Sequence, residues 1–400
     1  MNRKLAVLMV TAFVDMMGFI IVYPLLPFYA TRMGASAAMV GALIAAFSVA
    51  QLASAPAWGR LSDRYGRRPA ILTGLLVSAA AYIVFAFAGT IWLLFLSRIV
   101  QGLGGGTIAV VQAYVTDITD GKDRAKSLGW LSAVTSLGAV IGPAIGSLLV
   151  SLGGRTAPGL GSAALCLLVS IFAWKFLRES RALESTLERA IPKSTTSSGA
   201  IRSVITRPKE PAARLIWIYA IAIGAFYGTG AMLPLILAER LEVNEQNIGY
   251  FIMYLGGIGV LVRTGILGRM IEWLGEAKLA RLGLVLLGAG LALVAFIGSY
   301  PMVAISFTLM PLGTAFIFPC ITAMLSRVVP HRERGLYMGV QHAFGGVSRV
   351  AFPLLAGYGM DVLGKGIPFL VAGAMVVATL LLTLSMEDYA LPPVGAATDG

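Results

Sequence analysis

Apolar runs of about twenty residues alternate with short charged, glycine-containing or proline-containing breaks along nearly the whole chain. A helix needs about 20 residues to cross the roughly 30 Å hydrocarbon core of a bilayer. A strand or loop facing lipid would leave backbone polar groups without partners. The pattern therefore predicts an all-α membrane protein with twelve transmembrane helices. Their expected limits are 5–30, 38–58, 70–89, 91–117, 125–152, 158–177, 213–238, 246–271, 279–298, 301–327, 335–361 and 366–386.

The composition supports this prediction. Of the 400 residues, 58% are hydrophobic and 12% are charged, whereas charged residues make up about 25% of a soluble domain. This argues against a soluble enzyme, a nucleic-acid binder and a secreted disulfide-rich protein. Cys166 and Cys320 lie in apolar runs, where we expect them to be small buried hydrophobes. We expect no cofactor and no metal site.

The basic residues are distributed unevenly between the two sides of the membrane. If the N-terminus is cytoplasmic, the inner loops and linker carry 24 of the 31 Lys and Arg residues. The outer loops then carry only Arg32, Arg155, Arg240 and Lys365. The positive-inside rule therefore predicts a multi-pass protein of the cell (inner) membrane with both termini cytoplasmic. The net charge of +12 is explained by this topology and by contact with the lipid bilayer, so no nucleic-acid partner is expected.

A duplication is visible within the chain. The segment from Gly59 to Gly66 aligns with that from Gly268 to Gly275 at an offset of 209, and Pro143 aligns with Pro353 at an offset of 210. Two matches at nearly one offset indicate two six-helix bundles of the same orientation. The expected domains are an N-terminal bundle 1–178, a cytoplasmic linker 179–212, a C-terminal bundle 213–389 and a cytoplasmic tail 390–400.

The loop after the second span reads Gly59-Arg60-Leu61-Ser62-Asp63-Arg64-Tyr65-Gly66-Arg67-Arg68-Pro69. This segment resembles the most characteristic signature of the major facilitator superfamily. Its glycines permit a tight turn between helices, and Asp63 can contact a helix N-terminus or a basic residue, which would latch the two halves on the cytoplasmic side. The alternative is an ordinary basic loop. The resemblance implies the major facilitator fold, with the substrate between two parallel-repeat halves. The expected gating residues are Gly59, Asp63, Arg64, Gly66, Arg67, Arg68 and, at the end of the fourth span, Asp117.

Two further spans carry similar signatures. In the fourth, Leu94, Arg98, Gln101, Gly102 and Gly104 are spaced as in the proton-coupled members of the superfamily. Arg98 is expected to lie roughly 10 Å deep, where an arginine is costly and indicates a functional site, or alternatively a structural brace. The fifth span resembles the antiporter signature, which suggests a helix that bends and slides, or alternatively a plain packing face. That signature contains Gly138, Gly142, Pro143 and Gly146, followed by Ser147 where a second glycine is usual.

Asp15 is the only carboxylate expected deep inside a span. It lies roughly 15 Å from the start of the first helix, and a charge there costs about 2.5 to 3.5 kcal/mol on insertion scales. Such a group can be protonated in one conformation and ionised in another, as a proton carrier requires. Its expected depth differs from that of Arg98 by about 5 Å. A switchable pair is therefore feasible, and a permanent salt bridge is the alternative.

The stretch from Asp15 to Pro27 resembles the first helix of tetracycline/proton antiporters and of the twelve-span drug/proton antiporter family. The resemblance implies that Asp15 takes part in proton coupling. We therefore expect a secondary active transporter, not an enzyme, that exports an amphiphilic small molecule such as a tetracycline-like drug in exchange for protons, by alternating access and as a monomer. The alternative is a proton-coupled or facilitative transporter of a metabolite or organic anion. The membrane interior is expected to hold three arginines, Arg98, Arg263 and Arg349, against one acid, and such a field would attract anions.

Candidate substrate-binding residues lie on the helices that line the central pathway in this family. His342 and Arg349 are seven residues apart and share a face of the eleventh span, and His titrates near neutrality. A packing role is the alternative for each candidate. The candidates are Phe19, Tyr23, Gln51, Gln112, Tyr227, Tyr254, Phe316, Phe318, His342 and Arg349.

Overall fold

The computed structural model describes residues 3–119, 121–177, 179, 197–384 and 386–389. The tail expected at 390–400 and residues 180–196 of the expected linker lie outside the described residues. The chain forms two compact units, one of residues 1–190 and 243–254 and the other of residues 191–242 and 255–400. All regular structure among the described residues is helical, so the fold is an all-α membrane protein, as predicted.

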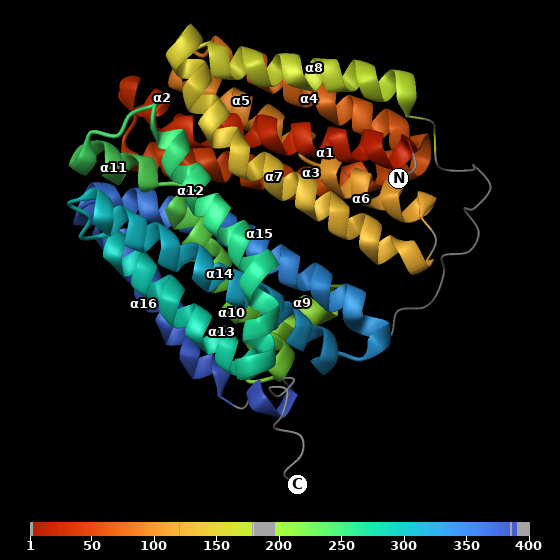
Figure 1. The fold of residues 1–400 in the computed structure, drawn as a ribbon, viewed down its shortest axis with the longest axis vertical. Helices are drawn as coiled ribbons and strands as arrows, with labels where there is room; N and C mark the ends of the chain where they lie inside the picture. Colours follow the sequence, from red (N-terminus) through yellow and green to blue (C-terminus); the bar gives the residue numbers. More distant parts are fainter. Residues whose placement is uncertain (1–2, 120, 178, 180–196, 385, 390–400) are drawn as a thin grey trace. The chain divides into compact units, whose positions relative to one another are not determined.

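Unit 1 is a helical bundle in which α1 lies beside α7 and α8 (Figure 1). Helix α4 packs on α8, and α3 packs on α5. Side-chain caps begin two of the helices: the Ser36 hydroxyl accepts from the Met39 N–H, and the Thr90 hydroxyl from the Leu93 N–H. The helices are α1 (Arg3–Val22), α2 (Leu26–Arg32), α3 (Ala37–Tyr65), α4 (Arg67–Ala86), α5 (Ile91–Gly104), α6 (Thr107–Ile118), α7 (Gly121–Gly153) and α8 (Ala157–Phe176).

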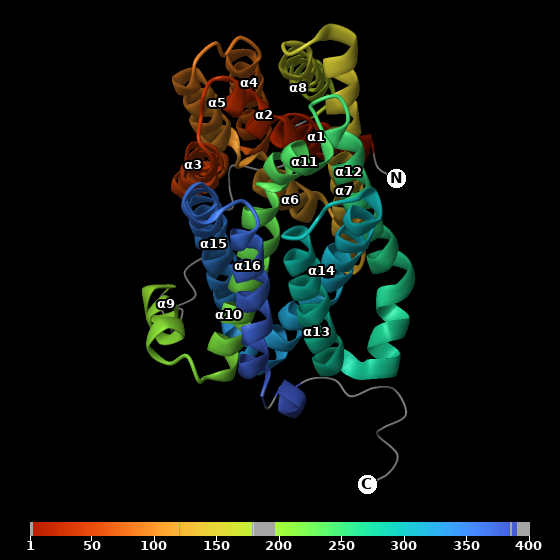
Figure 2. The same ribbon diagram turned by 90° about the vertical axis from the view of Figure 1, so that its left-hand side faces the viewer.

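Unit 2 is built around α13, which packs on α14 and α16, and around the pair of α10 and α15 (Figure 2). Its first helix, α9, falls within the expected linker. The helices are α9 (Ser197–Thr206), α10 (Pro211–Ile223), α11 (Leu233–Leu241), α13 (Leu267–Val294), α14 (Tyr300–Val328), α15 (Arg334–Leu363) and α16 (Ile367–Ala378), while α12 (Ile248–Leu261) begins in unit 1 and ends in unit 2.

The duplication is repeated in the backbone. Among the described residues, six have a positive φ, three before and three after residue 200. They pair at offsets of 208, 209 and 210 residues, and each pair follows a membrane helix. Because a positive φ disfavours every residue with a side chain, its recurrence at one offset indicates a repeated structural unit. The pairs are Gly34 with Glu242, Gly66 with Gly275, and Gly154 with Gly364.

The helices provide the predicted spans. By length and apolarity, nine helical segments within the described ranges can cross a bilayer. The longest, Ile248–Val294, changes direction at Gly275 and so contains two spans. Helix α15 and the shorter apolar segment Ile367–Thr383 complete the twelve.

Two spans are less regular than predicted. The fourth is broken between α5 and α6 at Gly104–Gly106. The seventh is α10 followed by a π-helical turn, Gly224–Thr229, and then by α11. Glycine, a poor helix former, occurs at both breaks: at 104–106 in the fourth span, and at Gly224, Gly228 and Gly230 in the seventh.

Candidate functional site

The glycines of the antiporter signature press against α1, the helix that carries Asp15. A Cβ on Gly138 would lie 2.7 Å from the Phe13 carbonyl oxygen, and one on Gly142 would lie 3.0 Å from that of Met17. On Gly146 it would overlap the carbonyl oxygen of Ile21. Backbone therefore meets backbone along three successive turns. The close contact explains the four-residue glycine spacing, because residues four apart share a helix face.

Asp15 lies on the opposite side of α1 from these glycines. Phe13 and Met17 face α7, and a residue two positions from each is rotated by about 200° around the helix. Asp15 is half-buried, and its carboxyl group makes no hydrogen bond or ion pair with any described residue. Tyr82 of α4 and Cys166 of α8 lie within electrostatic range of it.

Asp15 and Arg98 form no ion pair in this structure, so the permanent salt bridge considered for them is absent from the described contacts. Arg98 is 1% exposed. Its guanidinium carbon lies 5.3 Å from the centre of the Phe85 ring, a cation–π distance, and its Nε lies 3.5 Å from the Ser97 hydroxyl. Tyr82 is within electrostatic range of both Asp15 and Arg98.

The glycine break after α5 is covered by side chains of α3. Trp58 Nε1 donates to the Leu103 carbonyl at 2.6 Å, and Gln51 Nε2 donates to the Gly105 carbonyl at 3.3 Å. These bonds satisfy carbonyl groups that the broken helix leaves without partners. Gln51, expected to line the substrate pathway, therefore has a structural partner here.

Arg67 is the centre of the loop motif that follows α3. Its Nε donates to Asp117 Oδ2 at 2.9 Å, and its Nη1 donates to Ser62 Oγ at 2.8 Å and to Asp63 Oδ1 at 3.1 Å. Asp63 therefore contacts a basic residue, one of the two partners expected for it. Arg67 joins α3, α4 and α6 within unit 1, and Asp117, grouped with the loop from the sequence, is one of its partners.

The N-terminus of α4 is occupied by Glu179, not by Asp63. The two oxygens of the Glu179 carboxylate accept from the backbone N–H groups of Arg67 and Arg68 at 2.9 and 3.0 Å. An acid at a helix N-terminus is stabilised by the free N–H groups and the helix dipole. The Arg68 side chain donates to the Trp174 carbonyl of α8, and Arg64 stacks on Tyr65.

The expectation that both glycines of this loop form the turn is wrong for Gly59. Gly59 lies inside α3, and a Cβ there would meet open space. Gly66 alone makes the turn, with φ of 100°, and a Cβ on it would overlap the Glu179 carboxylate. The helix extends past Gly59 because the following residues, as far as Tyr65, are compatible with a helical backbone.

Ser147, the departure from the antiporter signature, anchors the segment that precedes α12. Its hydroxyl donates to the Glu245 carbonyl at 2.7 Å and accepts from the Gly249 N–H at 2.9 Å. The Glu245 side chain is buried and pairs with Arg32, with Nη2 to Oε1 at 2.7 Å. A Cβ on Gly249 would overlap the Pro143 carbonyl. A glycine at position 147 could not make either hydrogen bond.

We expect Ser147→Ala to lower the thermal unfolding temperature of the purified protein. Ser147 is fully buried, and a buried group that loses its partner costs about 1 to 3 kcal/mol. Ser151→Ala is the control, because the Ser151 hydroxyl bonds only within its own helix. Equal unfolding temperatures for the two variants would show that Ser147 does not anchor the segment.

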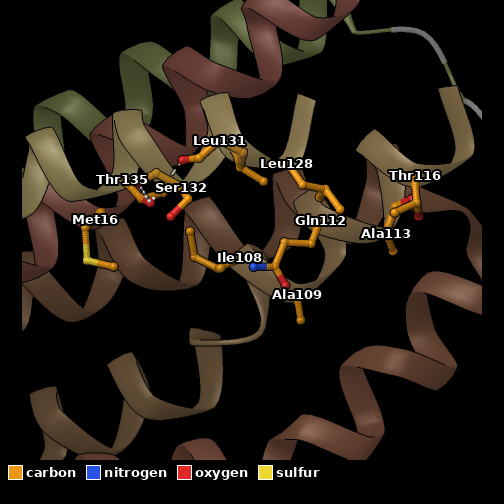
Figure 3. A pocket seen from close by; sticks show the side chains of 10 residues that line it. All are labelled: Met16, Ile108, Ala109, Gln112, Ala113, Thr116, Leu128, Leu131, Ser132 and Thr135. Carbon is orange, nitrogen blue, oxygen red and sulfur yellow. Dashed lines mark hydrogen bonds between the residues drawn. The ribbon is translucent and has the colours of Figure 1, made fainter. Parts of the chain in front are cut away.

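A cavity of about 540 Å³ opens between α1, α6 and α7 in unit 1 (Figure 3). Its volume lies in the range of small-molecule pockets, about 300 to 1,000 Å³. No charged side chain lines it. The Gln112 amide and the Ser132 hydroxyl have no partner among the described residues, whereas Thr116 and Thr135 donate to carbonyls of their own helices. The lining residues are Met16, Ile108, Ala109, Gln112, Ala113, Thr116, Leu128, Leu131, Ser132 and Thr135.

Of the other substrate-binding candidates in unit 1, none lines this cavity. Phe19 stacks on Phe47 of α3 with ring centres 5.0 Å apart and contacts Tyr23 at 5.5 Å. Tyr254, near the end of unit 1, is exposed. Gln112 is therefore the one candidate from the sequence that the structure places in the cavity.

In unit 2, three of the substrate-binding candidates lie near Tyr219 of α10. Its ring lies 5.3 Å from that of Phe318 and meets the His342 ring edge-on at 6.2 Å. Arg349 lies within electrostatic range of Tyr219 and His342. Tyr219 itself was not selected from the sequence, because nothing in α10 marks it beyond its aromatic ring.

Two other candidates in unit 2 differ from each other in exposure. Tyr227 is exposed and lies in the π-helical turn, packed edge-on against Phe226. The expectation that Phe316 lines the pathway is wrong. Phe316 is 3% exposed and packs where Gly283 lets α13 and α14 approach. Phe318, two residues further on, is rotated to another face of α14.

The comparisons with known proteins cover nearly the whole chain. The family model described as Major Facilitator Superfamily matches residues 8–278 and 264–399. Multidrug resistance protein 2 of Bacillus subtilis (strain 168) is 28% identical over 96% of this chain and 94% of its own length. Tetracycline resistance protein, class E, of Escherichia coli is 30% identical over 89% of this chain and 87% of its own.

A solved structure shares the fold. The human organic anion transporter MFSD10 (TETRAN) superposes with a TM-score of 0.68 and 22% identity, over 95% of this chain and 99% of that one. Together with the twelve helices, the repeated glycine turns and the loop motif around Arg67, these matches identify the family. The chain belongs to the Major Facilitator Superfamily.

Proposed function

We propose that this protein is a secondary transporter that exports amphiphilic drugs in exchange for protons. The observation that carries the proposal is Asp15, a carboxyl group in the first helix that is only half-buried and has no ion-pair partner among the described residues. A carboxyl group held by a permanent salt bridge could not exchange its proton readily. The similarity to relatives named for multidrug and tetracycline resistance supports drugs as the substrate class.

The proposed transport cycle uses one site that opens alternately to the two sides of the membrane. With the site open outward, Asp15 takes up a proton and the drug leaves. With it open inward, Asp15 loses the proton and a new drug molecule binds. We further propose that both termini are cytoplasmic, since the basic residues gather in the loops on that side, and that the protein works as a monomer.

The cavity in unit 1 is the proposed contact surface for the drug. Its apolar side chains suit the body of an amphiphile, and Gln112 and Ser132 supply hydrogen-bonding groups that no described residue uses. Arg98, one of the three arginines for which we considered an organic anion from the sequence, is buried and absent from the lining. This arrangement favours a drug over an organic anion at this surface.

The proposal is tested in proteoliposomes with an acidic lumen. Adding a transported drug outside should raise the lumenal pH, because each drug molecule that enters is exchanged for a proton that leaves. A panel of tetracycline, a cationic dye and an anionic dye identifies the class. A protein that moves one of these compounds without any change of lumenal pH would contradict proton exchange, and movement of the anionic dye alone would favour the organic-anion alternative.

A further inference from the structure

Two buried polar atoms of α5 have no partner within the part of the chain that the structure describes. Arg98 Nη2 is a hydrogen-bond donor and Gln101 Oε1 is an acceptor, and neither has a hydrogen bond to any described residue. Both residues are at least 97% buried. They lie three positions apart in the helix, so they share a face. Because buried polar groups in proteins are almost always paired, with protein or with ordered water, this face needs a further partner.

The hydroxyl of Tyr82 connects this face of α5 to α1. Gln101 Nε2 donates to Tyr82 Oη at 2.8 Å, so the hydroxyl is an acceptor there. Its own hydrogen has no acceptor among the described residues, although a phenol can donate one hydrogen bond. A Cβ on Gly18 would lie 3.5 Å from Tyr82 Oη. Gly18 is one helical turn from Asp15, so the hydroxyl lies against the face of α1 that carries the carboxyl group.

Four groups on three helices lie within electrostatic or hydrogen-bonding range of the Tyr82 side chain. They are Asp15 of α1, Arg98 and Gln101 of α5, and Cys166 of α8. Only Asp15 and Arg98 among them can carry a charge near neutral pH. Among the described residues, the buried atoms without a partner are the donor Arg98 Nη2 and the acceptor Gln101 Oε1.

We propose that Tyr82 is a positioning residue for proton exchange, and that a water molecule bound by Arg98 and Gln101 links its hydroxyl group to Asp15. The water accepts from Arg98 Nη2 and donates to Gln101 Oε1, which gives both atoms a partner. A polar site with at least two partners is the kind that holds a buried water. This inference rests on the proposed role of Asp15.

In this arrangement Tyr82 keeps its own proton throughout. When Asp15 is ionised, the bound water accepts a hydrogen bond from the Tyr82 hydroxyl and donates one to the carboxylate, which stabilises its charge. When Asp15 is protonated, the water accepts the hydrogen bond of the carboxyl instead. The exchanged proton passes between Asp15 and water, so no other group in the cluster gains or loses a proton. Removing the Tyr82 hydroxyl should therefore make ionisation of Asp15 harder.

The test is an infrared titration of the Asp15 carboxyl group in the full-length protein. The carbonyl stretch of protonated Asp15 is identified as the band that Asp15→Asn removes. We expect Tyr82→Phe and Gln101→Leu each to move the midpoint of this band by about one unit toward higher pH, the size that loss of a hydrogen bond to a charged group gives. Tyr29→Phe is the matched control, since it removes a buried hydroxyl that donates to the Arg155 carbonyl at 2.8 Å.

The outcomes separate this inference from the proposed function. A shift in both variants but not in the control supports the network, even if the protein exchanges no drug for protons, which would overturn the proposed function alone. If the titration midpoints of Tyr82→Phe and Gln101→Leu both equal that of Tyr29→Phe, the proposed hydrogen-bond network is wrong, even if drug export is proton-driven. If Tyr82→Phe fails to fold, Gln101→Leu decides the question. It removes both the amide group that donates to the Tyr82 hydroxyl and the amide oxygen that accepts from the water.

Discussion

Asp15→Asn is expected to abolish proton-driven drug accumulation while leaving downhill movement of drug intact. For one-for-one exchange, a gradient of one pH unit supplies about 1.4 kcal/mol, which sustains roughly a tenfold concentration ratio. An asparagine side chain is always neutral, so the variant permanently mimics protonated Asp15 and cannot release a proton. The accumulation ratio in proteoliposomes with a pH gradient should therefore fall from about ten to about one.

The control for this substitution is Asp123→Asn, which makes the same change at an exposed position in the first turn of α7. It should accumulate drug as the unaltered protein does. Counterflow, in which labelled drug exchanges with unlabelled drug without a gradient, should continue in both variants. An Asp15→Asn protein that still concentrates drug tenfold would assign proton coupling to another group, and the first to examine would be His342 of unit 2.

The fold could be predicted because its determinants are periodic or local. Apolar runs of span length give the helices, and the recurrence of Gly66 at Gly275 gives the duplication, since each needs a positive φ. The break at Gly104–Gly106 was not predicted, although three consecutive glycines are written in the sequence. A span remains apolar when its helix is interrupted, so hydropathy alone cannot reveal the interruption.

The candidate site could be predicted only in part, because its partners come from different helices. Asp15 and Arg98 stand out in the sequence as charges in apolar runs. Tyr82, in contrast, is an ordinary aromatic residue of a membrane helix. Only the packing of α4 against α5 and the contact of its ring with Gly18 of α1 place it within electrostatic range of both charges. Ser147 looked like a weakened signature in the sequence. Its hydroxyl nevertheless bonds to Glu245 and Gly249, which lie about 100 residues further along the chain.

Gly146→Ala is expected to disturb transport through the packing of α1. A Cβ at this position would overlap the Ile21 carbonyl oxygen, which belongs to the backbone and cannot rotate away as a side chain can. Helix α1 must then shift relative to α7 by an amount on the order of 1 Å. Overpacking of this kind costs about 1 to 3 kcal/mol. Because α1 carries Asp15 on its far side, the carboxyl group moves relative to Tyr82, and we expect proton-driven drug accumulation to fall to less than half.

The matched control is Gly129→Ala in the same helix, where a Cβ meets open space. Alanine is a better helix former than glycine by about 1 kcal/mol, so this variant should be at least as stable as the original protein and should transport normally. The two variants together separate the glycine contact from a general effect of alanine on α7. If Gly146→Ala matched Gly129→Ala in unfolding temperature and in drug accumulation, the close approach of α1 and α7 would not be what the glycine spacing provides.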